Sequence, residues 1–165
     1  MKNDFKIVTL SNSFYKKYCS DRFPEILKKK TRPYNCLLTK SEKGYYICIP
    51  YRSSIRHSDS FLFYKDNSNK PYAGLDYTKI IILKDLDYVD NENVLIKTDH
   101  YKKTNLHIKR ICKDANEYVE NYKKYLEGEI EFDIREFERK YRYSTLKYFH
   151  DELGIKKETS SPLES

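Results

Sequence analysis

The sequence predicts an α+β fold, in which helices pack on a small antiparallel β-sheet or β-barrel. Two observations support this fold class. Short runs rich in β-branched and aromatic residues, separated by turn residues, occupy the chain up to about residue 96. From about Asp99 onward, apolar residues instead recur at steps of three and four, which is the spacing of amphipathic helices. Because strands and helices are segregated along the chain, an α+β arrangement is favoured.

The N-terminal part is expected to supply the sheet. Its clearest signal is a hairpin, in which the apolar runs Tyr34–Lys40 and Tyr45–Pro50 are joined by a turn ending at Gly44, which can take a positive φ. The continuously apolar run Ile80–Leu83 is typical of a buried central strand. The other predicted elements are strands at Phe5–Leu10, Asp59–Tyr64, Thr78–Lys84, Leu86–Val89 and Val94–Ile96, a brief helix at Phe14–Cys19 capped by Ser11 or Ser13, and a polar loop at Asn67–Gly74.

Three helices are predicted in the C-terminal part. A long amphipathic helix should run from about Asp99 to Gly128, with one face made by Leu106, Ile108, Ile111, Ala115, Tyr118, Tyr122 and Tyr125. Shorter helices are expected at Asp133–Arg142 and Ser144–Leu153. No long linker divides the chain, so we expect a single domain over residues 1–157 with a frayed tail at 158–165.

The composition points to a polyanionic partner. Lysine and arginine outnumber aspartate and glutamate by 32 to 25, which gives a formal net charge of +7, and there are 17 tyrosines. Positive charge attracts nucleic acid, and tyrosine rings can stack on unpaired bases, although most tyrosines pack at the edge of a core. The N-terminus lacks a signal peptide and no run suits a membrane span, so we expect a cytoplasmic protein with reduced thiols and no membrane partner.

Several common chemistries find no support in the residue pattern. The four cysteines do not fall in a zinc-binding motif, and the sequence has no HExxH motif, glycine-rich phosphate loop or Gly-x-Ser-x-Gly elbow. We therefore expect neither a metal nor a cofactor.

The stretch from Ile49 to Asp59 carries the residue types that RNA cleavage requires. Its polar members include Arg52, Ser53, Ser54, Arg56 and His57. RNA supplies its own nucleophile, the 2′-hydroxyl, so a metal-independent ribonuclease must align that group, move its proton and stabilise charge on the phosphate. Arginine binds phosphate oxygens bidentately, and histidine moves protons near neutral pH. From composition alone, an ordinary solvated loop is the better explanation.

Arg32 strengthens the functional interpretation. Antiparallel pairing brings the start of the first hairpin strand beside the end of the second, so Arg32 and residues 52–57 should lie at the same end of the sheet. We assign Arg32, Arg52 and Arg56 to the scissile phosphate, Ser53 and Ser54 to its oxygens or to the 2′-hydroxyl, and His57 to acid or base catalysis. The predicted RNA-binding residues are Lys28, Lys29, Lys30, Arg32, Tyr34 and Tyr51.

Four short motifs add a resemblance. They are Arg32-Pro33-Tyr34, Ile49–His57, Gly74–Lys79 and Tyr143–Asp151. In this order and spacing they resemble the toxins of type III toxin–antitoxin systems, in particular the TenpN/CptN branch related to ToxN and AbiQ, over about residues 5–153. The resemblance implies a Kid/MazF-like β-barrel core elaborated by helices. It also implies an endoribonuclease that leaves 2′,3′-cyclic phosphate and 5′-hydroxyl ends.

The resemblance further implies partners. Such toxins cut a repeat-encoded antitoxin RNA, folded as a pseudoknot, from its precursor and stay bound to it in a closed protein–RNA assembly. Free toxin cuts cellular RNA, and related systems can abort phage infection. ToxN-like members have lysines where Arg32 and Arg56 stand here, and arginine is not a realistic general base. Proton transfer would then depend on His57 or on a hydroxyl group, or catalysis would rest mainly on positioning of the RNA and stabilisation of charge. The alternatives are a non-catalytic RNA-binding module and a protein–protein module.

Overall fold

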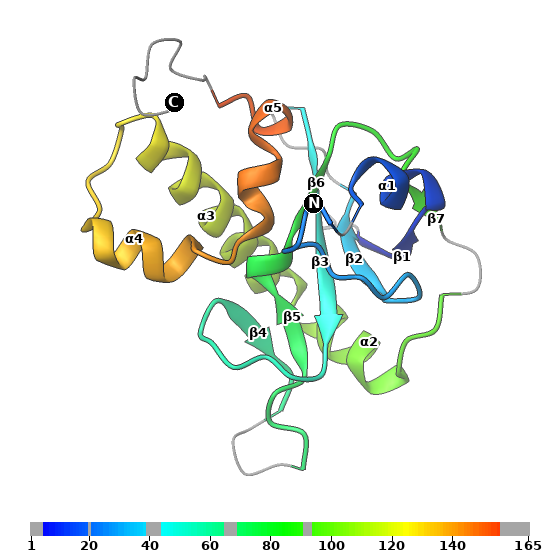
Figure 1. Cartoon of the computed structure of the whole chain (residues 1–165). Coiled ribbons are helices and arrows are strands. Elements are labelled where there is room, and N and C mark those ends of the chain that lie inside the picture. Colours follow the sequence, from blue (N-terminus) through cyan, green and yellow to red (C-terminus); the bar gives the residue numbers. More distant parts are fainter. Residues whose placement is uncertain (1–4, 20, 39–43, 65–68, 91–93, 156–165) are drawn as a thin grey trace.

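The computed structural model describes residues 5–19, 21–38, 44–64, 69–90 and 94–155 (Figure 1). Within these residues the chain forms an antiparallel sheet with helices packed against it, which confirms the α+β prediction. The predicted tail at 158–165 and most of the hairpin turn, residues 39–43, lie outside the described residues.

The sheet is open rather than closed into a barrel. Its strands are β1 (Phe5–Leu10), β2 (Tyr34–Leu37), β3 (Tyr46–Arg52), β4 (Ser60–Leu62), β5 (Gly74–Asp76), β6 (Ile81–Leu83) and β7 (Val89–Asp90). They follow the order β4-β5-β3-β2-β1-β7, with β6 paired to β3. Within the part of the chain that the structure describes, the outermost strands β4 and β7 do not pair with each other, so the predicted alternative of a closed β-barrel is wrong.

Strand β3 organises the sheet. One edge pairs with β2 in the predicted hairpin, with Tyr34 opposite Pro50. The other edge is shared, because β6 pairs with its first half and β5 with its last two residues. The prediction of a buried strand over Ile80–Leu83 is confirmed by β6, but its predicted central position in the sheet is wrong. Strand β6 pairs only with β3 among the described strands, and its apolar residues are buried by contact with C-terminal helices instead.

The helical elements are α1 (Asn12–Lys17), α2 (Thr98–Leu106), α3 (Ile108–Leu126), α4 (Ile134–Tyr141) and α5 (His150–Leu153), with 3₁₀ turns η1 (Tyr77–Lys79) and η2 (Thr145–Tyr148). Ser11 caps α1, as one of the two predicted alternatives, and Asp133 caps α4. No strand forms at the predicted 94–96 position.

Two predicted helices are each divided in two. The predicted long helix breaks at His107 (φ −110°, ψ 20°), and Leu106 is 76% exposed rather than part of the buried face. The last predicted helix breaks at Phe149 (φ −120°, ψ 26°), whose ring is completely buried. In both cases the apolar spacing continues across the break, so periodicity alone does not reveal it.

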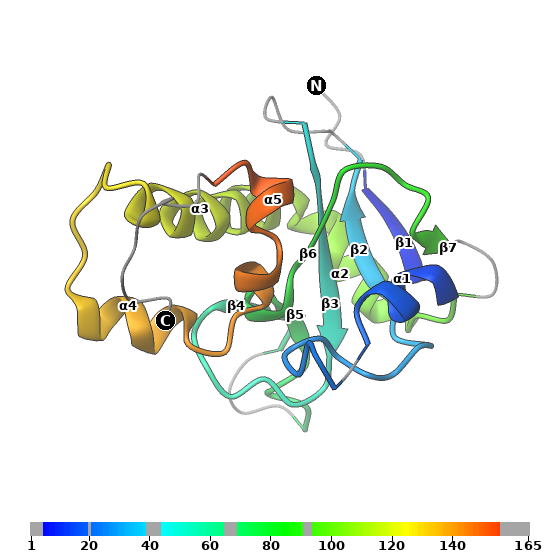
Figure 2. The same ribbon diagram turned by 45° about the horizontal axis from the view of Figure 1, so that its top comes forward.

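Figures 1 and 2 show how the helices surround the sheet. In both views α3 and α4 lie on one side of the sheet, and α1 and β7 lie at the opposite side of the molecule. The η2 and α5 elements contact β6 and thus join the C-terminal helices to the sheet. This arrangement leaves the exit of β3 accessible, which is the position of the predicted site.

Candidate functional site

A basic cleft of about 240 Å³ lies where β3 ends. Its polar lining includes Lys29, Arg32, Arg52, Ser53, Lys97 and His100. Segments far apart in the sequence meet here: the connection before β2, the exit of β3 and the residues that lead into α2. We call this hollow the basic cleft.

Arg32 and Arg52 lie at the same end of the sheet, as the hairpin predicts. Arg32 donates from Nη1 to the Tyr51 carbonyl oxygen across 2.9 Å, which holds the start of β2 against the end of β3. Burial lowers the pKa of Arg32, and the nearby Arg52 guanidinium lowers it further. Two guanidinium groups close enough to repel each other form a natural place for an anion.

Asp76 anchors the arginine side of the cleft. Its carboxylate is completely buried at the end of β5 and accepts from Arg52 Nη1 across 2.8 Å. Thr78 donates to Asp76 Oδ1 from both its backbone nitrogen, at 2.9 Å, and its hydroxyl, at 2.6 Å. Burial raises the pKa of Asp76, but hydrogen bonds from His57, Thr78 and Arg52 outweigh it and leave the pKa below its usual value. Asp76 is therefore a buried, charged carboxylate that holds Arg52, His57 and Thr78 in place.

His57 belongs to this network rather than to the cleft. Its Nε2 lies 3.1 Å from Asp76 Oδ1, and its Nδ1 accepts from the Asp59 backbone nitrogen across 3.2 Å. Nε2 thus faces the Asp76 carboxylate, while Nδ1 faces the backbone of the following loop. Because both ring nitrogens are engaged, His57 in this arrangement positions Asp76 and the following loop.

Only part of the predicted catalytic loop reaches the basic cleft. Ser53 lines it, whereas Ser54 and Arg56 are exposed and are not among the described residues that form its walls. Ile55 is buried and donates its backbone nitrogen to the Tyr72 backbone carbonyl oxygen at 2.9 Å, which ties the loop to Tyr72. Arg56 then stacks on the Tyr72 ring, 3.8 Å from its centroid. The joint assignment of Ser54 and Arg56 to the phosphate is not supported by this geometry.

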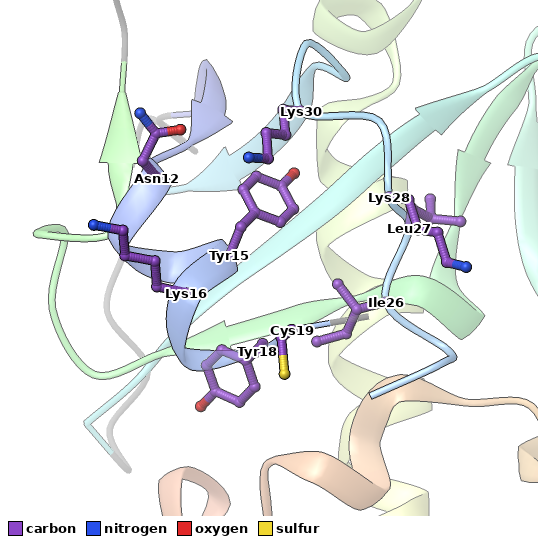
Figure 3. A pocket seen from close by; sticks show the side chains of 9 residues that line it. All are labelled: Asn12, Tyr15, Lys16, Tyr18, Cys19, Ile26, Leu27, Lys28 and Lys30. Carbon is purple, nitrogen blue, oxygen red and sulfur yellow. The ribbon is translucent and has the colours of Figure 1, made fainter. Parts of the chain in front are cut away.

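The predicted RNA-binding lysines are divided between two hollows. Lys29 lines the basic cleft, while Lys28 and Lys30 line a neighbouring pocket of about 460 Å³. Figure 3 shows that α1, the residues Tyr18 and Cys19 that follow it, and the segment from Ile26 to Lys30 supply the side chains of this second pocket, with Lys30 close to the Tyr15 ring. Lysines on both sides of one segment can contact successive phosphates of a bound strand.

The two tyrosines predicted to bind RNA are buried. Tyr34 has no exposed surface, and Tyr51 is 5% exposed with its hydroxyl 2.8 Å from Thr104 Oγ1. Neither ring is exposed enough to stack on a base, although Tyr51 is one of the residues that line the basic cleft. Their burial follows from the hairpin itself, because every residue of β2 is buried.

Asp76, Thr78, Lys97 and His100 are site residues that sequence reasoning missed. Asp76 and Thr78 stand in a motif that was recognised without any role being assigned to them. Lys97 and His100 carry no local signal, because they reach the cleft only through the packing of α2. The His100 ring packs on Phe63, with centroids 5.0 Å apart, and its Nε2 is buried without a hydrogen-bond partner among the described residues.

His100 is a neutral imidazole at the wall of a basic cleft. Burial lowers its pKa, and the nearby Lys97 and Lys70 lower it further, whereas Asp99 acts in the opposite direction. A neutral imidazole can accept a proton at neutral pH. The cleft therefore combines guanidinium groups, a serine hydroxyl and a basic imidazole.

Among the described residues, no cluster of histidine, cysteine, aspartate or glutamate side chains could hold a metal ion. The helices within the same residues include none long and apolar enough to cross a membrane. No protein-family model matches the chain, and comparisons with curated proteins and with solved structures found no match.

Proposed function

We propose that this protein is a metal-independent endoribonuclease that acts as the toxin of a type III toxin–antitoxin system. The observation that carries the proposal is the convergence of Arg32, Arg52 and Ser53 in one basic cleft. A phosphodiester is the biological anion that matches paired guanidinium forks. The net charge of +7 favours the approach of a polyanion over the whole surface.

The cleft accounts for charge stabilisation. The RNA 2′-oxygen attacks the adjacent phosphorus, and the bond from phosphorus to the 5′-oxygen breaks, which leaves a 2′,3′-cyclic phosphate. Arg32 and Arg52 neutralise the growing charge on the non-bridging oxygens, and Ser53 donates to one of them. Arg52 donates one of its five N–H groups to Asp76, so other N–H groups can donate to the phosphate.

Proton transfer in this scheme involves His100 more directly than His57. His100 lines the cleft as a neutral ring, and its Nδ1 accepts the 2′-hydroxyl proton, because Nε2 is buried. The departing 5′-oxygen takes its proton from water. His57 acts indirectly, by holding Asp76 and hence Arg52.

The toxin assignment rests on the resemblance of the four sequence motifs, which include Arg32, Arg52 and Asp76. The same resemblance suggests a pseudoknot antitoxin RNA as inhibitor and partner in a closed assembly, cellular RNA as the target and a Kid/MazF-like ancestry for the sheet. The lysine-lined pocket beside the basic cleft suits the extended contact that a folded RNA would make.

The decisive experiment is RNA cleavage in the presence of EDTA, followed by analysis of the end groups. The purified protein should produce 2′,3′-cyclic phosphate and 5′-hydroxyl ends. Arg32→Ala and Ser53→Ala should each lose about 10²–10³-fold in rate, as expected for removal of a group that stabilises the transition state. Arg56→Ala and Ser54→Ala are matched controls, because the same residue types stand outside the cleft and should retain most activity.

A non-catalytic RNA-binding module is the rival function, and one observation favours it. Arg52 and His57 are both engaged by Asp76, as in a purely structural network. This rival predicts salt-sensitive RNA binding without any cleavage by the wild-type protein. Loss of cleavage in the control variants to the same extent as in the cleft variants would also contradict the proposed site.

A further inference from the structure

A third hollow adjoins the Asp76 network, because Tyr77, the residue after Asp76, is part of its lining. It measures about 240 Å³ and is lined by Asp59, Tyr77, Asp114, Glu117, Tyr118 and Asn121, among others. We call it the polar pocket. Its lining begins at Ser58, the residue after His57. Asp59 donates its backbone nitrogen to His57 Nδ1, and its carbonyl oxygen accepts from the Tyr77 nitrogen across 3.0 Å.

Two buried tyrosines form the base of the polar pocket. Tyr77 and Tyr118 are 4% and 3% exposed, and their ring centroids lie 6.5 Å apart. Both hydroxyl groups are buried and make no hydrogen bond within the described residues. Burial raises the pKa of Tyr77, and the nearby Asp114 carboxylate raises it further, which places Asp114 beside the Tyr77 hydroxyl. A buried polar group without a partner costs about 1–3 kcal/mol, so these hydroxyls favour a ligand that supplies one.

The charges around the polar pocket select the chemistry of that ligand. Each carboxylate of the pocket has a cationic partner: Asp59 pairs with Lys140, Asp114 lies 3.5 Å from Arg110 Nε, and Glu117 lies 4.0 Å from Lys113. Arg110 and Lys140 also line the pocket. Asp114 and Glu117 follow each other at a spacing of three on α3, so their carboxylates lie on one face. An ion pair with one cation leaves further lone pairs on a carboxylate, which can accept N–H donors.

RNA is the ligand class that the proposed function brings to this side of the cleft, and its bases differ in the donors they present. Guanine offers an imino N–H beside an exocyclic amino group on one edge. Uracil offers a single N–H between two carbonyl groups. Proteins recognise single-stranded bases through such edges. A carboxylate therefore discriminates in favour of guanine.

We infer that the polar pocket binds a guanine base of the RNA whose phosphodiester lies in the basic cleft. The inference rests on the proposed function. Asp114 accepts from the imino and amino groups, the Tyr77 and Tyr118 hydroxyls pair with the remaining polar atoms, and Asn121 contributes an amide at the rim. The pocket thus gives the enzyme a base preference next to the cleavage site, while the arginine cleft binds phosphate without regard to sequence.

The test is an NMR titration of the isotope-labelled full chain with guanosine, inosine and uridine 5′-monophosphates at millimolar concentration. Guanosine monophosphate should shift the amide signals of residues 58–60 and 114–121 and bind about tenfold more tightly than uridine monophosphate. Inosine monophosphate lacks the amino group and should fall between them. Inorganic phosphate should shift only signals around the basic cleft.

Variants assign the preference to the polar pocket. Asp114→Asn should reduce the affinity for guanosine monophosphate about tenfold and remove its advantage over uridine monophosphate. Tyr118→Phe keeps the ring and removes only the hydroxyl, and it should weaken binding to a smaller extent. Asp87→Asn and Tyr143→Phe make the same chemical changes at exposed positions outside the pocket and should have no effect.

The outcomes separate this inference from the proposed function. Equal affinity for the guanine and uracil nucleotides, or signal shifts confined to the basic cleft, would overturn the guanine pocket even if RNA is cleaved. Guanine-selective shifts around residues 114–121 would support the pocket even if no RNA is cleaved, and in that case only the nuclease assignment fails.

Discussion

Single residues of the candidate site act mainly through Asp76. This carboxylate is completely buried, yet three groups from separate segments reach it: Arg52 at the end of β3, His57 in the following loop and Thr78 in η1. A buried charge is tolerated only when it is paired and hydrogen-bonded, and these three donors meet that requirement. Asp76 thereby fixes the positions of the Arg52, His57 and Thr78 side chains.

Replacing Asp76 by asparagine should expose this role through the pH dependence of stability. Its pKa in the folded protein lies below the ordinary value of 3.8, so its contribution is fully present above that pH and is lost as the pH falls through the lower, folded value. We expect Asp76→Asn to lower the free energy of unfolding at pH 7 by about 1–3 kcal/mol and to matter less at pH 3. Urea denaturation at both pH values measures this. An equal loss at both would contradict it, and Asp87→Asn serves as control.

The two histidines should differ in their effect on the pH–rate profile of RNA cleavage. The pKa of His100 is lowered from 6.5, so the rate should fall with acid only below that pH, where its ring becomes protonated. His100→Gln should lose about 10²–10⁴-fold in rate and also lose this acid limb. His57→Gln should lower the rate but keep the limb. Single-turnover rates across pH distinguish them, and an acid limb that disappears only in His57→Gln would reverse the two roles.

At the level of elements, the exit of β3 is positioned by its pairing with β5, which in turn pairs with β4. Gly74 lies between both neighbours, opposite Arg52 on one side and Leu62 on the other. A Cβ atom at this position would collide with the backbone carbonyl oxygen of Phe61. Only glycine lets β4 approach β5 so closely, and β4 carries the loop from His57 to Asp59 into place.

Gly74→Ala should therefore separate β4 from β5. Overpacking of this kind costs about 1–3 kcal/mol, and the thermal midpoint should fall accordingly. If the variant still folds, its RNA cleavage should drop more than that of Ser54→Ala, an exposed small-residue change in the neighbouring loop. Differential scanning calorimetry and a cleavage assay test the two parts, and an unchanged melting temperature would show that the strands can move apart at no cost.

For the whole molecule, the net charge of +7 and the two lysine-lined hollows predict salt-sensitive RNA binding. Each phosphate neutralised on single-stranded RNA contributes a slope of about −0.7 in log affinity against log salt. Lys29→Ala and Lys97→Ala, which alter the basic cleft, should each reduce the slope by about that amount. The exposed Lys102→Ala and Lys124→Ala are controls with the same charge change. Equal effects from all four would indicate diffuse attraction without a defined cleft.

Much of the site could be predicted where it depends on local pairing. The hairpin and its register follow from two apolar runs and a turn glycine, and they place Arg32 beside Arg52. The position of the Arg56 side chain could not be predicted, because it depends on the buried Ile55 and on the Tyr72 ring. The place of His100 in the cleft could not be predicted either, because His100 reaches the cleft only through the packing of α2, in which Thr104 contacts the Tyr51 hydroxyl.

The sequence by itself determined the α+β class, most element positions and the meeting of two arginines at one sheet end. These features depend on side-chain period and turn chemistry, which neighbouring residues encode. Only the tertiary structure decided that the sheet stays open, that the predicted long helix divides at His107 and the last predicted helix at Phe149, and that Asp76 and His100 complete the site. Those outcomes depend on burial and on hydrogen bonds between distant segments, whose energies no local pattern contains.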